Sequence, residues 1–281
     1  MPKACHICQN KICQKSSLGT LDFCDFGIAF YNDNGTIQTK EEAVTLKHVS
    51  HNLRHELNKV LQLIISEAAK IDPQVTTKSI NTQSPASRIV GATIIIDQFI
   101  EMIAGVNEFH PSRSYSTNLE KKANLHQILN KYTSIYSLIQ NTRRAKNIEI
   151  KIICPREMEI SFASQIVEYI FSIFIDNMWK YSLDNSKATI EVKLSNSNFY
   201  DIVFTNDSML IENTAQIFNK GFQENSESEG FGYGLYWASI LARHYNELGK
   251  RTTSLMSIEH SQYEISSKEA KQIFTIRNIR A

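Results

Sequence analysis

The sequence predicts an α+β protein built from three parts. A small cysteine-rich module comes first, an antiparallel helical hairpin that pairs with a second copy into a four-helix bundle follows, and a two-layer α/β sandwich ends the chain. Three observations predict this order: cysteines gather near the start, two long stretches then space apolar residues three or four apart, and helical and alternating patterns interleave afterwards. The expected parts are residues 1–38, 39–112 and 113–281.

The composition of the 281 residues narrows the classes of function. Lys and Arg number 30 against 29 Asp and Glu, so the formal charge is +1 and gives no broad attraction to nucleic acid or to an anionic membrane. No apolar run reaches the roughly 18–20 residues that span a bilayer, and the first residues lack the apolar segment of a signal peptide. We therefore expect a cytoplasmic protein with neither nucleic acid nor membrane as partner.

The first module carries four of the five cysteines. Cys5 and Cys8 form a C-x-x-C pair, and Cys13 and Cys24 complete the set. Four thiolates satisfy tetrahedral Zn²⁺, and a metal would supply folding energy that so short a segment lacks. The sequence leaves two interpretations open, a zinc site or a loose tail with free thiols.

Two amphipathic helices are expected next. The first, from about residue 40 to 71, has apolar residues at Leu46, Val49, Leu53, Leu57, Val60, Ile64, Ala68 and Ile71. Pro73 stops it, and Ser84 fits an N-cap with Pro85 at the first position of a second helix that runs to about Phe109. A lone hairpin cannot cover two such apolar stripes, so we expect a homodimer.

The remaining chain predicts the sandwich. Helices are expected over residues 124–140, 164–180 and 230–245. Strands are expected over residues 147–154, 188–194, 199–205, 254–259 and 272–277.

Four motifs, in order, resemble the boxes of two-component sensor histidine kinases. SHNLRHEL (residues 50–57) resembles the phosphoacceptor box, and IFSIFIDNMWKYS (170–182) the asparagine box of the ATP-binding domain. IFNKGF is similar to the phenylalanine box, and GFGYGL to the glycine box. The matching residues in the last three boxes are Asn177, Lys180, Tyr181, Phe218, Phe222, Gly230, Gly232, Gly234 and Leu235.

The resemblance implies a Bergerat-type (GHKL-like) domain that binds ATP with Mg²⁺. The amide oxygen of Asn177 would hold the Mg²⁺, which takes few protein ligands. The glycines would let the backbone approach the phosphates and aim N–H groups at them. A histidine of the hairpin would then take the phosphoryl group and pass it to a separate response-regulator receiver.

Three positions depart from the family pattern. The adenine-contact box usually reads D-x-G-x-G, and here Asn206 stands in place of the aspartate, without either glycine. Asp207 would serve only by a shift of one residue. One turn before Asn177, a commonly polar position is Ile173, and the residue after the acceptor His51 is Asn52 in place of an acid.

The phosphoacceptor box fits two registers. Reading His51 as the acceptor keeps the flanking residues in their family places. Reading His55 puts Glu56 beside the imidazole, where a carboxylate would orient the ring and raise its basicity. We take His51 as the acceptor and keep His55 as the alternative.

The function expected from the sequence is that of a dimeric histidine kinase that phosphorylates itself from ATP. The alternative is a degenerate pseudokinase, a dimeric scaffold or histidine phosphotransfer protein that senses nucleotide. Ile173 and the altered adenine box are the features that keep the alternative open.

Overall fold

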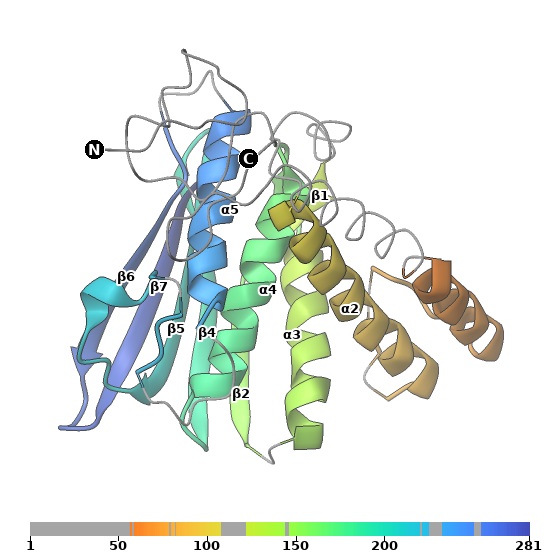
Figure 1. Cartoon of the computed structure of the whole chain (residues 1–281), viewed down its shortest axis with the longest axis horizontal. Helices are drawn as coiled ribbons and strands as arrows, with labels where there is room; N and C mark the ends of the chain where they lie inside the picture. The colour runs from red at the N-terminus through yellow and green to blue at the C-terminus, as the bar shows by residue number, and fades with distance from the viewer. Residues whose placement is uncertain are drawn as a thin grey trace, which may run out of the picture. The chain divides into compact units, whose positions relative to one another are not determined.

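A computed structural model describes residues 57, 59–78, 80, 81, 83–107, 122–143, 146–219, 221–224, 232–249 and 254–281. They form a mixed α+β structure of helices and a five-stranded sheet (Figure 1). The described residues group into two compact units, one with residues 57–67 and 93–107 and the other with residues 68–92 and 122–281. This grouping differs from the predicted division in that the start of the second hairpin helix joins the sandwich.

The hairpin helices follow their predicted start and stop signals. The first described helix ends at residue 71, directly before Asp72 and Pro73. Helix α2 (Pro85–Asn107) begins at the predicted proline, and the Ser84 hydroxyl accepts a hydrogen bond from the Ser87 N–H at 3.3 Å. Ser84 also donates to the Asp72 carboxylate at 2.7 Å, which ties the end of one helix to the start of the next. The predicted N-cap is therefore confirmed.

The second unit contains one main sheet and three long helices. The sheet order is β2 (Ile148–Ile153), β4 (Ser186–Asn196), β5 (Phe199–Met209), β7 (Glu269–Arg280) and β6 (Ser257–Glu264). Only the β2–β4 pair of that sheet is parallel. Helices α3 (Leu125–Arg143), α4 (Ser164–Tyr181) and α5 (Gly234–Leu248) lie along one face of it (Figure 1). The short strands β1 (Ala123–Asn124) and β3 (Glu159–Ile160) pair separately, and Thr214–Gln216 forms a 3₁₀ turn, η3.

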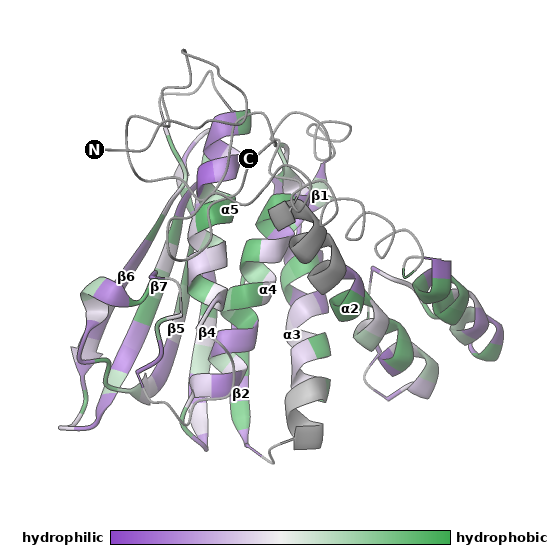
Figure 2. Cartoon of the chain, in the orientation of Figure 1, coloured by the Kyte–Doolittle hydropathy of each residue, from purple (hydrophilic) through white to green (hydrophobic). Residues whose placement is uncertain are grey.

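Alternation along the strands places the core between the sheet and the helices. Every second residue of β5 is buried, and the Phe204 ring stacks on Phe174 of α4 with centroids 5.3 Å apart. The ring centroid of Phe274, on β7, also lies 5.3 Å from that of Phe174. Hydrophobic side chains on α4 thus fix the position of the helix against the central strands. In Figure 2 hydrophobic and hydrophilic residues alternate along the strands accordingly.

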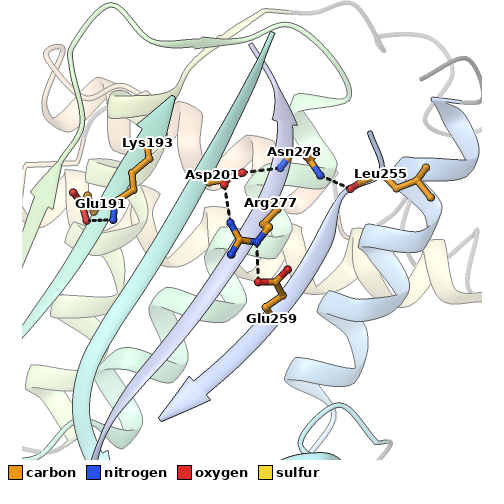
Figure 3. Close-up of polar contacts among 7 residues, drawn as sticks. All are labelled: Glu191, Lys193, Asp201, Leu255, Glu259, Arg277 and Asn278. Atoms are coloured by element: carbon orange, nitrogen blue, oxygen red, sulfur yellow. Dashed lines mark hydrogen bonds and ion pairs between the residues drawn. The ribbon is translucent and has the colours of Figure 1, made fainter. Parts of the chain in front are cut away.

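The other face of the sheet carries paired charges. Arg277 of β7 donates from Nη1 to Asp201 of β5 at 2.9 Å and from Nε to Glu259 of β6 at 2.7 Å (Figure 3). Asn278 adopts a left-handed conformation (φ 60°), and its backbone N–H donates to Asp201 at 3.1 Å. The left-handed residue lies next to the register shift between β5 and β7. Three strands are thereby tied together at this end.

Strand and helix boundaries are longer than predicted in several places. Strand β5 continues to Met209, four residues beyond its expected end, and β7 and β6 extend alongside it. The reason is visible in the pairing, because each added residue of β5 finds a partner on β7. The predicted pairing of the hairpin with a second copy and the cysteine-rich module stay predictions, since the structure holds one chain and residues 1–56 lie outside its described part.

The carboxyl end of α5 is anchored by Arg280. Its guanidinium donates from Nη2 to the Gly249 carbonyl at 2.9 Å and lies 4.1 Å from the Phe162 ring centroid. Replacing Arg280→Met removes the charged hydrogen bond and the cation–π contact, and we expect a loss of about 2–3 kcal/mol in the free energy of unfolding. Arg280→Lys, which keeps the charge near the helix end, should lose less. Urea unfolding followed by circular dichroism measures both, and equal stability of Arg280→Met and the wild type would contradict the anchor.

Candidate functional site

The start of α5 lies against the carboxyl-terminal half of α4. A Cβ atom added at Gly234 would lie 3.5 Å from Ile173 Cγ2 and 3.9 Å from the Asn177 amide oxygen. The two motifs that the sequence separates by more than 50 residues therefore meet in space. The Asn177 amide therefore lies beside the end of α5 at which free N–H groups point outward.

Gly232 brings the glycine box against the phenylalanine box. Its φ is 67°, and a Cβ there would come within 2.6 Å of the Gly221 carbonyl carbon. The Gly221 N–H also donates to the Gly232 carbonyl at 3.2 Å. No side chain fits between these backbones, so glycine at 232 is required both by conformation and by space.

Strand β5 separates the two candidate base-contact residues by face. Asn206 points to the helix-covered side and is 5% exposed, in the alternation that also buries Phe204. Asp207 points to the opposite side, where Lys271 of the paired β7 position lies 3.2 Å from its carboxylate. The one-residue shift that would let Asp207 replace Asn206 is therefore not the arrangement in this structure.

A ladder of amide side chains supports the chain at residues 209–211. Gln272 of β7 donates from Nε2 to the Met209 carbonyl at 2.9 Å and to Gln262 Oε1 at 3.0 Å. Gln262 of β6 binds both backbone groups of Ile211, at 2.7 Å to the carbonyl and 3.2 Å from the N–H. The segment 209–211 is thus held against the sheet by the side chains of β6 and β7.

His260 completes the amide ladder and fixes its orientation. The Nε2 atom of His260 lies 2.7 Å from Gln272 Oε1. Because both donors of the Gln272 amide are used, its oxygen must accept, so His260 carries a proton on Nε2. Burial lowers the pKa of His260, which favours the neutral ring. Gln272, 2% exposed, lies on the inward phase of a predicted strand, so a polar residue in an apolar alternation was the signal that the sequence offered.

Two polar groups near the end of α4 are buried with hydrogen-bonding capacity to spare. Within the described ranges, none of the side-chain hydrogen bonds involves the Asn206 amide, and the Ser182 hydroxyl, in a fully buried residue, has no partner. Ser182 forms a bridge with Ser208, one inward position beyond Asn206 on β5. A buried polar group without a partner costs about 1–3 kcal/mol, so it indicates a ligand or a bound water.

The other predicted residues of the ATP-binding boxes are placed as follows. Lys180 forms an ion pair with Asp176, one turn earlier on α4, and so faces a carboxylate. Tyr181 is 46% exposed, and its carbonyl accepts a hydrogen bond from Ser208 at 2.8 Å. Phe218 and Phe222 are half-buried on either side of Gly221, and Leu235 is half-buried in the first turn of α5.

Several predicted site residues lie outside the described part of the chain. They are His51, His55, Glu56, Gly230, Cys5, Cys8, Cys13 and Cys24. Among the residues that the structure does describe, no three His, Cys, Asp or Glu side chains gather closely enough to hold a metal ion. The zinc site therefore stays a prediction. The described helices include none that combines the length and apolar character needed to cross a bilayer.

A separate cavity of about 440 Å³ lies between the start of α2 and the second half of α3. Its lining is Pro85, Arg88, Ile89, Gly91, Ala92, Ile135 and Leu138. It shares no residue with the motif site, and apart from Arg88 its lining side chains are apolar. Such a lining has few polar groups that could bind a charged ligand. The cavity is therefore a poorer candidate for a phosphate site than the surroundings of Asn177 and the start of α5.

Comparison with solved structures identifies a likeness of fold. The mycobacterial sensor histidine kinase MprB aligns with a TM-score of 0.43 and 10% identity, over 58% of this chain and 100% of that chain. Full-length ShkA in complex with AMPPNP aligns at 0.44 and 16%, over 84% of this chain and 46% of that one. The catalytic domain of histidine kinase ThkA aligns at 0.41 and 14%, over 56% and 95%.

The chain resembles histidine kinase structures. No family model matches the sequence, and no curated protein does. The identities and scores carry no residue's role across, so the function has to be argued from the geometry of this chain.

The contact between the glycine and phenylalanine boxes predicts unequal effects at two glycines. Gly221→Ala adds a Cβ in open space, so its cost is the left-handed backbone alone (φ 78°), about 1–2 kcal/mol. Gly232→Ala pays the same conformational cost and also forces the 221–222 backbone away. We expect Gly232→Ala to lower the unfolding midpoint more than Gly221→Ala and to speed proteolysis at 218–234. Equal effects in thermal unfolding and limited proteolysis would contradict the close packing.

Proposed function

We propose that the chain is a dimeric histidine kinase that binds ATP with Mg²⁺ and phosphorylates a histidine of its own helical hairpin. The observation that carries the proposal is the meeting of the Asn177 amide with Gly234 at the start of α5. The neighbouring contact of Gly232 with residues 221–222 supports the same site, because two sequence motifs converge on it.

The phosphates would lie at the start of α5. The helix of 15 residues presents free N–H groups there, and the glycines at 232 and 234 leave the backbone accessible. The Asn177 amide oxygen would hold the Mg²⁺. When bound, ATP supplies the phosphoryl group and Mg²⁺ spreads the charge that develops on its oxygens. The side chains of this chain position the nucleotide and exclude water.

The base would lie near the inward face of β5. Asn206 offers an amide with both donor and acceptor atoms, buried and not engaged by the described chain. The amide ladder keeps the neighbouring residues 209–211 on the sheet. A rigid strand with two uncommitted polar groups, Asn206 on it and Ser182 beside it, supports a site for a ligand with complementary edge atoms.

Apolar exposure supports the dimer. The helix of residues 59–71 exposes Val60, Leu63, Ile64 and Ile71, and the last is 73% exposed. The α2 helix exposes Ile89 and Ile96. In Figure 2 hydrophobic residues are seen on the first helix and on the coloured part of α2. Large apolar side chains at helical spacing on a surface indicate a partner, and a second copy of the hairpin fits because it offers the same stripes.

The acceptor would be His51, with His55 as the alternative, next to Glu56. A neutral imidazole nitrogen would attack the terminal phosphorus, the P–O bond to ADP would break, and the phosphohistidine would pass its phosphoryl group to a separate response-regulator receiver. These three residues belong to the same predicted helix as residues 59–71. The soluble, cytoplasmic setting follows from the composition argument and is part of the proposal.

Ile173 favours a second candidate function. Its side chain lies 3.5 Å from the Cβ position of residue 234, beside Asn177, where it can neither accept nor donate a proton. A site with this residue supports nucleotide binding better than proton transfer. The second candidate is therefore a pseudokinase scaffold that binds nucleotide and forms no phosphohistidine.

Nucleotide binding is tested by thermal unfolding with ATP and Mg²⁺. Binding at about 100 times the Kd would stabilise the fold by about 2.7 kcal/mol, a shift of several degrees. Asn177→Ala should abolish most of the Mg²⁺-dependent part of the shift, because the amide oxygen is lost. Asn198→Ala, in the exposed turn between β4 and β5, is the matched control and should shift like the wild type. An unchanged midpoint at millimolar ATP would remove the basis of the nucleotide site.

Phosphotransfer is tested separately on the purified chain with radiolabelled ATP and Mg²⁺. The kinase predicts an acid-labile, alkali-stable label that His51→Ala removes and His55→Ala retains. Loss of the label in His55→Ala alone would assign the acceptor to His55. A thermal shift without any label would establish the scaffold in place of the kinase.

A further inference from the structure

We propose that the base site of this chain is read by the Asn206 amide and that it accepts guanine as well as adenine nucleotides. The inference rests on the proposed nucleotide site and adds the class of substrate. It starts from which polar groups of the altered adenine box face the helix-covered side of β5.

The carboxylate of this box is turned away from the site. Asp207 lies on the outer face of the sheet and pairs with Lys271 at 3.2 Å. Its backbone carbonyl is also held, by the Leu183 N–H at 2.8 Å. Moving Asp207 inward would shift every side chain of β5 to the other face and expose Phe204. Asn206 is therefore the box residue whose side chain is available on the inward face.

Apart from the Ser182 hydroxyl, which has no partner and can donate or accept like an amide, the neighbouring polar groups on this face are already engaged. Ser208 donates to the Tyr181 carbonyl at 2.8 Å, and the amide of Gln272, which pairs with Asn206 across the sheet, uses all its atoms in the ladder. The ladder also prevents residues 209–211 from rearranging to bring another group forward. Recognition of a base edge consequently falls to the Asn206 amide on a fixed strand and the nearby Ser182 hydroxyl, and both groups can donate as well as accept.

An amide side chain can form a hydrogen bond with the group at position 6 of either purine, adenine or guanine. Adenine carries an amino donor there and guanine an oxo acceptor. A carboxylate accepts hydrogen bonds only, so it attracts the amino group and repels the oxo group. Rotation of the Asn206 amide by half a turn exchanges its oxygen and its NH₂, and each orientation matches one base. The atoms of the ladder do not fix that rotation, because they do not bind the Asn206 side chain.

Isothermal titration calorimetry of the full chain with ATP–Mg and with GTP–Mg tests the inference. For the wild type we expect the two Kd values to agree within about threefold, since the amide offers each base one matched pair. Asn206→Asp should prefer ATP by about tenfold or more, because the carboxylate repels the guanine oxygen. Asn206→Leu, which has no polar group, should weaken both nucleotides by a similar factor. Using the ratio within each variant cancels any change in folding.

Three outcomes contradict the inference. A wild-type preference for ATP of about tenfold or more overturns it and leaves the nucleotide site intact. An unchanged ratio in Asn206→Asp, with a normal unfolding midpoint, assigns base reading to another residue. Binding of neither nucleotide overturns the proposed function together with this inference, and the wild-type measurement alone decides that case.

Discussion

The close approach of backbone to backbone around Gly232 is the constraint on which the site depends. The turn before α5 can reach residues 221–222 only because position 232 has no side chain, and α5 then starts beside the side chains of Ile173 and Asn177. Two further contacts hold α5 in place, since Arg280 binds its carboxyl end and Tyr245 of the helix packs edge-to-face on Phe162. A helix fixed at one end presents its other end, with its free N–H groups, in a constant position. Preorganisation of this kind is what phosphate binding requires.

Strand β5 continues through residues 206–209, a stretch without glycine. The backbone groups of this stretch and of the residues after it need hydrogen-bond partners. Pairing with β7 supplies them as far as Met209, and the side chains of Gln262 and Gln272 supply them beyond. This part of the sheet is therefore held by a ladder of amides and an imidazole, none of which adds a negative charge.

Much of the second unit follows from the sequence, and the exceptions have physical causes. The proline and serine signals gave the start of α2, and alternation gave the strands, because both act through neighbouring residues. The extension of β5 and the amide ladder depend on distant partners that local patterns do not contain, such as Gln262 for Ile211, 51 residues away, and Gln272 for Met209, 63 residues away. The motifs indicated that Asn177 and the glycine box belong together, and their contact agrees with that. The pairing register of β5 determines which face of the sheet Asp207 points to. A shift of one residue would turn every side chain of the strand to the other face.

The described site has groups that favour the binding of a triphosphate. It lacks groups that would favour proton transfer. Asn177 and Asn206 are neutral amides, Ile173 is apolar, and the nearby Asp176 is neutralised by Lys180. A triphosphate meets little repulsion from such groups, and helix α5 adds a favourable dipole. An imidazole acceptor is neutral near pH 7 and already has a lone pair, so it needs less help from a base than a hydroxyl would. The same residues that make the site poor for general-base chemistry are therefore compatible with transfer to histidine.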